Sequence, residues 1–122
     1  MTPAARSVHL FGLYLCLLGP GLTLIPGPLL APFAIAAPTE IWVRVAGLLV
    51  GLIGLYYLVA ARHELTPLIR ASVWGRAAVL PLFAALVAFH GAPAALLVFG
   101  AVDAAAALWT GLALRRTRTV AA

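Results

Sequence analysis

The sequence has no lysine and a single cysteine, Cys16, and only 9% of its 122 residues are charged. Soluble domains carry about a quarter charged residues. Hydrophobic residues make up 65% of the chain instead. A chain this short has too much surface for its volume to hide so many apolar side chains in one water-soluble core. We therefore predict an integral membrane protein whose remaining apolar surface is covered by lipid.

The scarcity of cysteine and the distribution of charge exclude two other classes. A disulfide-rich secreted protein needs paired cysteines, and Cys16 lies inside the first apolar stretch, where we interpret it as a buried inert thiol. The net charge is +5, but the basic residues are dispersed among the ends of apolar stretches. Because they do not gather on one polar face, we predict no nucleic-acid binding. No cleavage site followed by a hydrophilic domain marks the first apolar stretch as a signal peptide.

Four apolar stretches approach the length of a membrane-spanning helix, which needs roughly 20 residues. They cover approximately residues 8–25, 41–61, 72–89 and 93–114. Pro93 suits the first turn of the last one, where its missing N–H is not needed. We predict an all-α, polytopic membrane protein in which residues 1–122 form a single domain, a bundle of four transmembrane helices.

Prolines and glycines interrupt the first half of the chain. Gly19, Pro20 and Gly21 lie within the first stretch and are expected to kink that helix or end it early. Residues 26–38 are apolar but contain four prolines, which excludes a regular spanning helix. This segment is expected to be an interfacial loop or a short surface helix. A re-entrant loop, sheltered by the protein, is the alternative.

The arginines give the four spans a direction. Seven of the eight fall on one side of a four-span arrangement: Arg6, Arg62, Arg70, Arg76, Arg115, Arg116 and Arg118. The other side has only Arg44, just inside the second span. Because basic residues are enriched on the cytoplasmic side of membrane proteins, we predict that both termini are cytoplasmic.

Asp103 is the strongest candidate for a functional residue, since it lies near the middle of the fourth span. A carboxylate at that depth costs about 2.5–3.5 kcal/mol on insertion scales and normally faces the bundle interior beside a partner. The candidate partners are Arg76, near the inner end of the third span, and Arg44, near the outer end of the second. Possible further hydrogen-bond donors are Tyr56, Tyr57 and Thr110.

Two interpretations of this group stay open. In the first, Asp103 and an arginine line a polar cavity that binds a headgroup, a quinone or another amphipathic molecule, or that relays a proton. In the second, the pair is a buried structural ion pair that fixes the register of the helices.

Small residues predict where helices approach closely. Gly47, Gly51 and Gly54 lie in the second span, and the first two form a GxxxG motif. Gly100 and Ala104 give the fourth span a matching smooth face. We expect the second and fourth spans to pack on each other. The alternative is that these glycines form a homodimer or contact another membrane subunit.

Motifs of enzymes are missing. The sequence has no evident nucleophile–base pair, phosphate-binding or dinucleotide-binding loop or CxxC motif, and His9, His63 and His90 lack the spacing of metal ligands on one helix. We therefore predict no catalytic residue, metal or cofactor, and nothing indicates an enzyme acting alone.

The overall layout resembles small bacterial inner-membrane proteins of the DoxX-like family. The features are four short spans, Trp42-Val43-Arg44 at the start of the second, Tyr56-Tyr57 near its end, and Gly75-Arg76 in the third. The resemblance covers most of the chain and implies a location in the bacterial inner membrane and a role beside quinone-linked oxidoreductases. It carries over no functional residue.

Two functions follow as hypotheses. The first is a non-catalytic protein that binds membrane lipids or a quinone-like molecule, or that serves as an accessory subunit of a membrane complex. The second is a proton-coupled small transporter or channel, built as a homo-oligomer around Asp103.

Overall fold

The protein is all-α, as predicted. The computed structural model describes residues 1–35 and 41–121, and their side chains except those of 117–121. Its helices are α1 (Pro3–Leu24), α2 (Pro26–Leu30), the 3₁₀ helix η1 (Ala31–Phe33), α3 (Trp42–Arg62), α4 (Thr66–His90) and α5 (Leu96–Ala121). Four of them, α1, α3, α4 and α5, are long and apolar enough to cross a membrane. This agrees with a multi-pass membrane protein.

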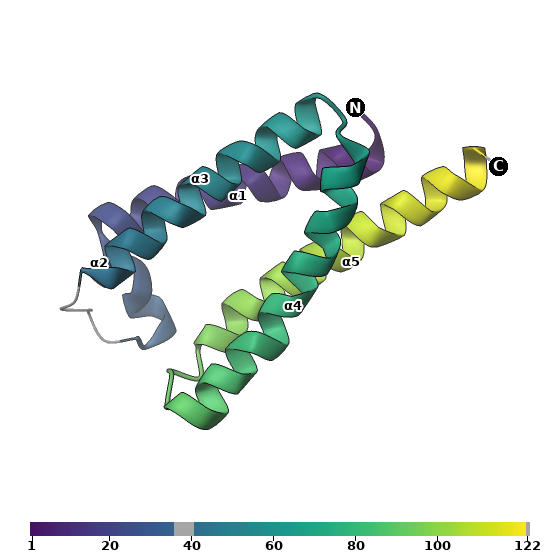
Figure 1. Ribbon diagram of the computed structural model, residues 1–122. Helices are drawn as coiled ribbons and strands as arrows, with labels where there is room; N and C mark the ends of the chain where they lie inside the picture. Colours follow the sequence, from purple (N-terminus) through teal and green to yellow (C-terminus); the bar gives the residue numbers. More distant parts are fainter. Residues whose placement is uncertain (36–40, 122) are drawn as a thin grey trace.

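The four long helices form two antiparallel pairs, α1 with α3 and α4 with α5 (Figure 1). The pairs meet where the first turns of α1 lie against α5, and they diverge toward their other ends (Figure 1). At the diverging ends the ring of Phe33 in η1 lies 4.8 Å from that of Phe99 in α5. The short helical segment after α1 therefore contacts the second pair as well as the first.

Two helices begin before the predicted boundaries. The first was expected from residue 8, but α1 begins at Pro3, because the Thr2 side chain accepts a hydrogen bond from Ala5 N over 3.1 Å and proline suits the first turn. The third was expected from residue 72, but α4 begins at Thr66 and has proline in its first turn. Hydropathy misses both starts, since capping and proline define them and not apolarity.

The start of α5 lies after the predicted position. Pro93 was expected in its first turn, but the α-helix begins at Leu96. Hydrogen bonds from Leu96 N to Pro93 O and from Leu97 N to Ala94 O, both 3.0 Å, are of the i to i+3 type. Pro93 therefore lies in a tight turn between α4 and α5, before the α-helical hydrogen bonds of α5 begin.

Of the two effects expected of Pro20, the early end is wrong, since α1 continues to Leu24, and the kink stays a prediction. Gly19 is buried against the backbone of α3, and this packing supports the helix across the proline. After α1, the short helices α2 and η1 confirm that the proline-rich segment is not a regular spanning helix. Whether it is interfacial or re-entrant stays a prediction, and its residues 36–40 lie outside the described part.

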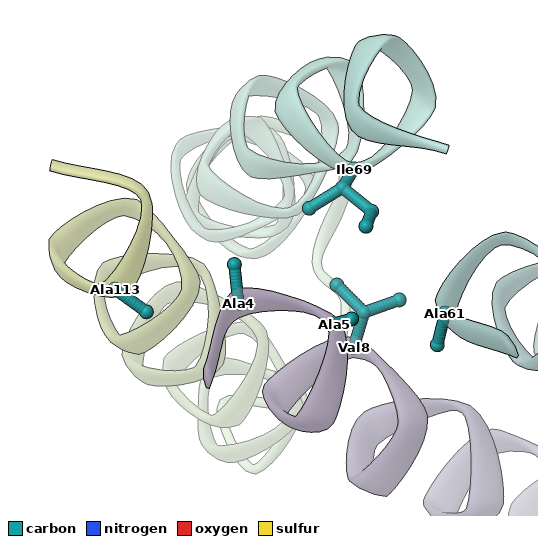
Figure 2. Close-up of a cluster of buried hydrophobic side chains, with 6 residues drawn as sticks. All are labelled: Ala4, Ala5, Val8, Ala61, Ile69 and Ala113. Atoms are coloured by element: carbon teal, nitrogen blue, oxygen red, sulfur yellow. The ribbon is translucent and has the colours of Figure 1, made fainter. Parts of the chain in front are cut away.

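The buried core lies where the two pairs meet. It consists mainly of small residues from all four long helices (Figure 2): Ala4, Ala5, Val8, Ala61, Ile69 and Ala113. Large apolar side chains point outward instead, for example Leu17 and Phe89, which are 79% and 81% exposed. Such an inverted distribution is expected where lipid and not water surrounds the helices.

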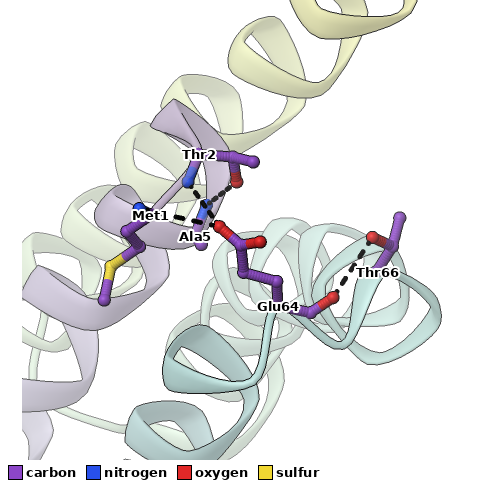
Figure 3. Close-up of polar contacts among 5 residues, drawn as sticks. All are labelled: Met1, Thr2, Ala5, Glu64 and Thr66. Carbon is purple, nitrogen blue, oxygen red and sulfur yellow. Dashed lines mark hydrogen bonds and ion pairs between the residues drawn. The ribbon is translucent and has the colours of Figure 1, made fainter.

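The N-terminus is attached to the loop between α3 and α4 (Figure 3). Thr2 N donates to Glu64 Oε1 over 2.7 Å, and the terminal amino group of Met1 lies 3.8 Å from the same oxygen. These contacts place the beginning of α1 beside the end of α3, which favours the antiparallel pairing of the two helices.

Candidate functional site

The candidate site is centred on Arg76, which is only 2% exposed. The sequence placed this residue near the inner end of its span. Because α4 begins at Thr66, however, Arg76 lies ten residues into the helix, almost three turns from its start. A guanidinium this deep in an apolar helix is costly unless its N–H groups find partners.

Hydrogen bonds satisfy most of the guanidinium. Arg76 Nε donates to Ser72 O over 3.2 Å, and Nη2 donates to Ser72 Oγ over 3.1 Å. Nη2 also donates to Thr110 Oγ1 in α5 over 2.9 Å. Ser72 lies one turn before Arg76, so the first two bonds stay within α4, whereas the third joins α4 to α5.

A second hydroxyl extends this network to α1. Ser7 Oγ and Thr110 Oγ1 are 2.6 Å apart, and both residues are fully buried. Ser7 Oγ also donates to Ala4 O over 2.7 Å, and Thr110 Oγ1 to Ala106 O over 3.1 Å. Thr110 Oγ1 accepts from Arg76 Nη2, and either hydroxyl can be the donor of the bond between Ser7 and Thr110. The chain of bonds therefore links α1, α4 and α5.

Aromatic rings from the first helix pair cover the guanidinium. Its central carbon lies 4.9 Å from the ring centroid of Phe11 in α1 and 5.7 Å from that of Tyr57 in α3. A desolvated cation–π contact of this kind contributes about 2 kcal/mol. The Phe11 ring also lies 5.5 Å from Tyr14 and 5.9 Å from Tyr57. Arg76 thus contacts side chains from all four long helices.

One nitrogen of the guanidinium is left over. Arg76 Nη1 is buried and has no hydrogen-bond partner among the described residues. Buried polar atoms of proteins nearly always have a partner, and an unpaired charged donor is especially costly. Nη1 therefore marks a place where an acceptor oxygen from outside the chain would be favourable.

Asp103 lies within Coulombic range of Arg76, Tyr14 and Tyr57 but does not pair directly with Arg76. In the described part of the chain its carboxylate takes part in no ion pair within 4 Å and no hydrogen bond. Thr110, which holds Arg76, lies seven residues after Asp103, or about 10 Å along the helix axis at 1.5 Å per residue. Binding to Thr110 thus keeps the guanidinium away from the carboxylate, and the expected direct ion pair does not form.

Two other predicted members lie apart from this site. Arg44 Nη1 donates to Thr23 O over 2.6 Å and to Leu24 O over 3.4 Å, so it caps the C-terminal end of α1. Tyr56 is 60% exposed on α3, whereas its neighbour Tyr57 faces Arg76. Of the predicted residues, the structure therefore brings together Arg76, Tyr57 and Thr110, with Asp103 close by.

The glycines of α3 pack on α1, not on the fourth span as predicted. A Cβ on Gly47 would lie 2.5 Å from Thr23 Oγ1, and one on Gly54 would lie 2.9 Å from Cys16 N. Gly51 is next to Gly19 in the same contact. The smooth face of the fourth span meets α4 instead, since a Cβ on Gly100 would lie 3.1 Å from Leu80 Cα. The sequence did not predict which helices are in contact, because small residues on three helices are equally suited to close packing.

Ser7, Phe11 and Ser72 are members of the site that sequence reasoning missed. The signal was present: both serines are polar residues within apolar stretches, and Ser72 lies four residues before Arg76 on the same helix face. Ser7 precedes the predicted first span, which begins at residue 8. It lies within α1 because that helix begins at Pro3.

Comparison of the chain with protein-family models, with curated proteins and with solved structures found no match. Within residues 1–35 and 41–121, no three His, Cys, Asp or Glu side chains are placed to hold one metal ion.

Proposed function

We propose that this is a small multi-pass membrane protein of the bacterial inner membrane that binds an amphipathic molecule through an acceptor oxygen on its polar head. The head is a quinone carbonyl or an anionic headgroup, and Arg76 Nη1 is its donor. The observation that carries the proposal is the buried Nη1, which has no partner among the described residues although the other two nitrogens of the guanidinium are bonded.

The surroundings of Arg76 support an amphipathic ligand. Phe11 and Tyr57 lie beside the guanidinium, and the ring of Tyr14 packs against that of Phe11. Rings of this kind pack on an apolar or aromatic head, and an arginine orients it by hydrogen bonds. The guanidinium is contacted by side chains from all four long helices, so a ligand bound at Nη1 would lie between the two helix pairs. A role beside a membrane oxidoreductase is compatible with such binding.

The direct test is ligand binding by the purified full chain in detergent. The probes are a short-tailed ubiquinone and dodecyl phosphate, which present a neutral and an anionic acceptor oxygen, and native mass spectrometry reports the bound fraction. Wild type should bind at least one probe. Arg76→Gln should lose that binding, whereas Arg44→Gln should retain it because Arg44 caps α1 away from the site.

A second variant keeps the proposal testable if Arg76→Gln does not fold. Phe11→Leu retains an apolar side chain and removes the ring that lies 4.9 Å from the guanidinium carbon, and it should weaken binding of the quinone. Thermal unfolding followed by circular dichroism checks that the variants are folded. Equal binding by folded Arg76→Gln and by wild type, or no binding of either probe to wild type, would contradict the proposal.

The position of Asp103 favours a second candidate function, a proton-coupled transporter or channel formed by a homo-oligomer. An acid within a span, near an arginine but not paired with it, is a possible proton carrier. Proton flux into liposomes containing the protein, followed by a trapped pH-sensitive dye, tests this function. Asp103→Asn should abolish the flux without lowering the unfolding temperature. Absence of flux with wild type, or a variant that only loses stability, would contradict it.

A further inference from the structure

A second site lies between α4 and α5, and no residue that lines it belongs to the Arg76 network. A cavity of about 400 Å³ has Val73, Ala77, Ala104, Ala107, Gly111 and Arg115 in its lining. A neighbouring cavity of about 250 Å³ is lined by Arg70, Val73, Trp74, Gly111, Leu114 and Arg115. The two cavities share Val73, Gly111 and Arg115, so they form one groove, which we call the α4–α5 groove.

We propose that the α4–α5 groove binds an anionic phospholipid, with an acyl chain along its apolar part and the phosphate at Arg70 and Arg115. This site is independent of the function proposed above.

The apolar part of the groove exists because its lining residues are small. Ala77, Ala104, Ala107 and Gly111 present at most one methyl group each. A Cβ on Gly111 would meet only Val73 Cγ1, at 3.6 Å, which is ordinary van der Waals contact. The space beside Gly111 is therefore open. An acyl chain of a membrane lipid has the shape and polarity to occupy it.

The cationic end of the groove indicates that its ligand is anionic. Arg70 of α4 and Arg115 of α5 both line the second cavity, and both are exposed. Trp74, which is 76% exposed, lies beside them. Arginine and tryptophan at one end of an apolar groove match the border between headgroups and acyl chains. Basic side chains at this border attract anionic lipids.

Charge complementarity favours a lipid over a second copy of the chain. Copies in one membrane have the same orientation, so a symmetric dimer through this groove would bring Arg70 and Arg115 of one copy toward the same residues of the other. Like charges in this arrangement repel. An anionic phosphate is attracted to both side chains instead.

The proposal predicts selective lipid binding by the purified full chain. Phosphatidylglycerol and phosphatidylcholine with identical acyl chains are added in detergent, and native mass spectrometry measures the bound fraction of each. Wild type should retain the anionic lipid more strongly, by about fivefold for each arginine that contacts the phosphate. Arg70→Gln and Arg115→Gln should each reduce this preference. Arg116→Gln, with the same loss of charge next along the chain but outside the lining of the groove, should not.

The acyl-chain part is tested by filling it. Gly111→Leu should reduce the binding of both lipids, since its side chain would project into the groove. Gly75→Leu is the matched control, because Gly75 also lies within a helix and has nothing within 4 Å of its Cβ position. Equal retention of the two lipids by wild type, undiminished binding by Gly111→Leu, or a dimer that Gly111→Leu abolishes would each overturn the proposal.

Discussion

Arg76 Nη2 and Thr110 Oγ1 are 2.9 Å apart, and this hydrogen bond joins α4 to α5 at the level where α1 also contacts both helices. Thr110 is fully buried, and its hydroxyl lies 2.6 Å from that of Ser7. One threonine therefore connects the buried charge of the second helix pair to the first. The stability of the junction should depend on this hydroxyl.

Thr110→Val should destabilise the protein. Valine has the shape of threonine but leaves Arg76 Nη2 without its acceptor in α5 and Ser7 Oγ without its neighbour. An unsatisfied buried polar group costs about 1–3 kcal/mol. Unfolding in mixed micelles with increasing dodecyl sulfate measures the change. Thr110→Ser retains the hydroxyl and should lose much less, and equal losses for the two variants would show that the hydroxyl is unimportant.

The packing of α1 on α3 should be sensitive to one methyl group at Gly19 and insensitive at Gly51. A Cβ on Gly19 would lie 2.5 Å from Gly51 N, which requires the helices to move apart, whereas a Cβ on Gly51 would meet its nearest atom only at 3.9 Å. Gly19→Ala should therefore lower the free energy of unfolding by about 1–3 kcal/mol, as overpacking does. Gly51→Ala should not lower it and should raise it by about 0.5–1 kcal/mol, because alanine is favoured over glycine inside a helix where its Cβ has room. The same unfolding assay compares them, and a large loss at Gly51 would contradict this arrangement of the helices.

Two glycines of the second helix pair should respond to alanine with opposite signs. Gly91 ends α4 with φ of 69°, a left-handed conformation that costs a residue with a Cβ about 1–2 kcal/mol. Gly75 lies inside α4 with open space at its Cβ position. Gly91→Ala should destabilise, and Gly75→Ala should stabilise by about 0.5–1 kcal/mol. Thermal unfolding by circular dichroism distinguishes them, and a shift of the same sign for both would contradict the prediction.

The orientation in the membrane is testable with single cysteines in a Cys16→Ser background. Ala94→Cys lies in the exposed connection between α4 and α5, and His63→Cys lies in the exposed connection between α3 and α4. If the arginine-rich side is cytoplasmic, a membrane-impermeant maleimide added to intact cells should label position 94 and not position 63. Both should be labelled after the cells are broken. Labelling of position 63 in intact cells would reverse the predicted orientation.

The apolar stretches of the sequence were sufficient to predict the all-α class and the approximate positions of the four long apolar helices. The described helices coincide with the predicted apolar stretches except at their ends, where Thr2 and Pro3 start α1 and a turn at Pro93 delays α5. These ends depend on capping and turn geometry within a few residues, to which an average over a long apolar window is insensitive.

Sequence reasoning identified Arg76, Tyr57 and Thr110 as candidates but not their arrangement. It expected Asp103 to pair with Arg76 or Arg44, because opposite charges in an apolar medium attract. In the structure, Arg76 donates hydrogen bonds to Ser72 and Thr110 instead. The partners of Arg76 depend on which residues of the neighbouring helices lie at the same depth. The depth of Arg76 was not predicted, because α4 begins earlier than expected, at Thr66.

The sequence by itself determined that this chain is helical and apolar, with four segments long enough to cross a membrane. These properties are local, because each span must satisfy its own backbone hydrogen bonds and match the bilayer on its own. Only the tertiary structure decided that α1 pairs with α3 and α4 with α5, and that Arg76 lies buried where all four meet. In lipid, helices pair where small residues allow close contact, as Gly19 does with Gly51. Such contacts depend on the three-dimensional fit of residues that are distant in the chain.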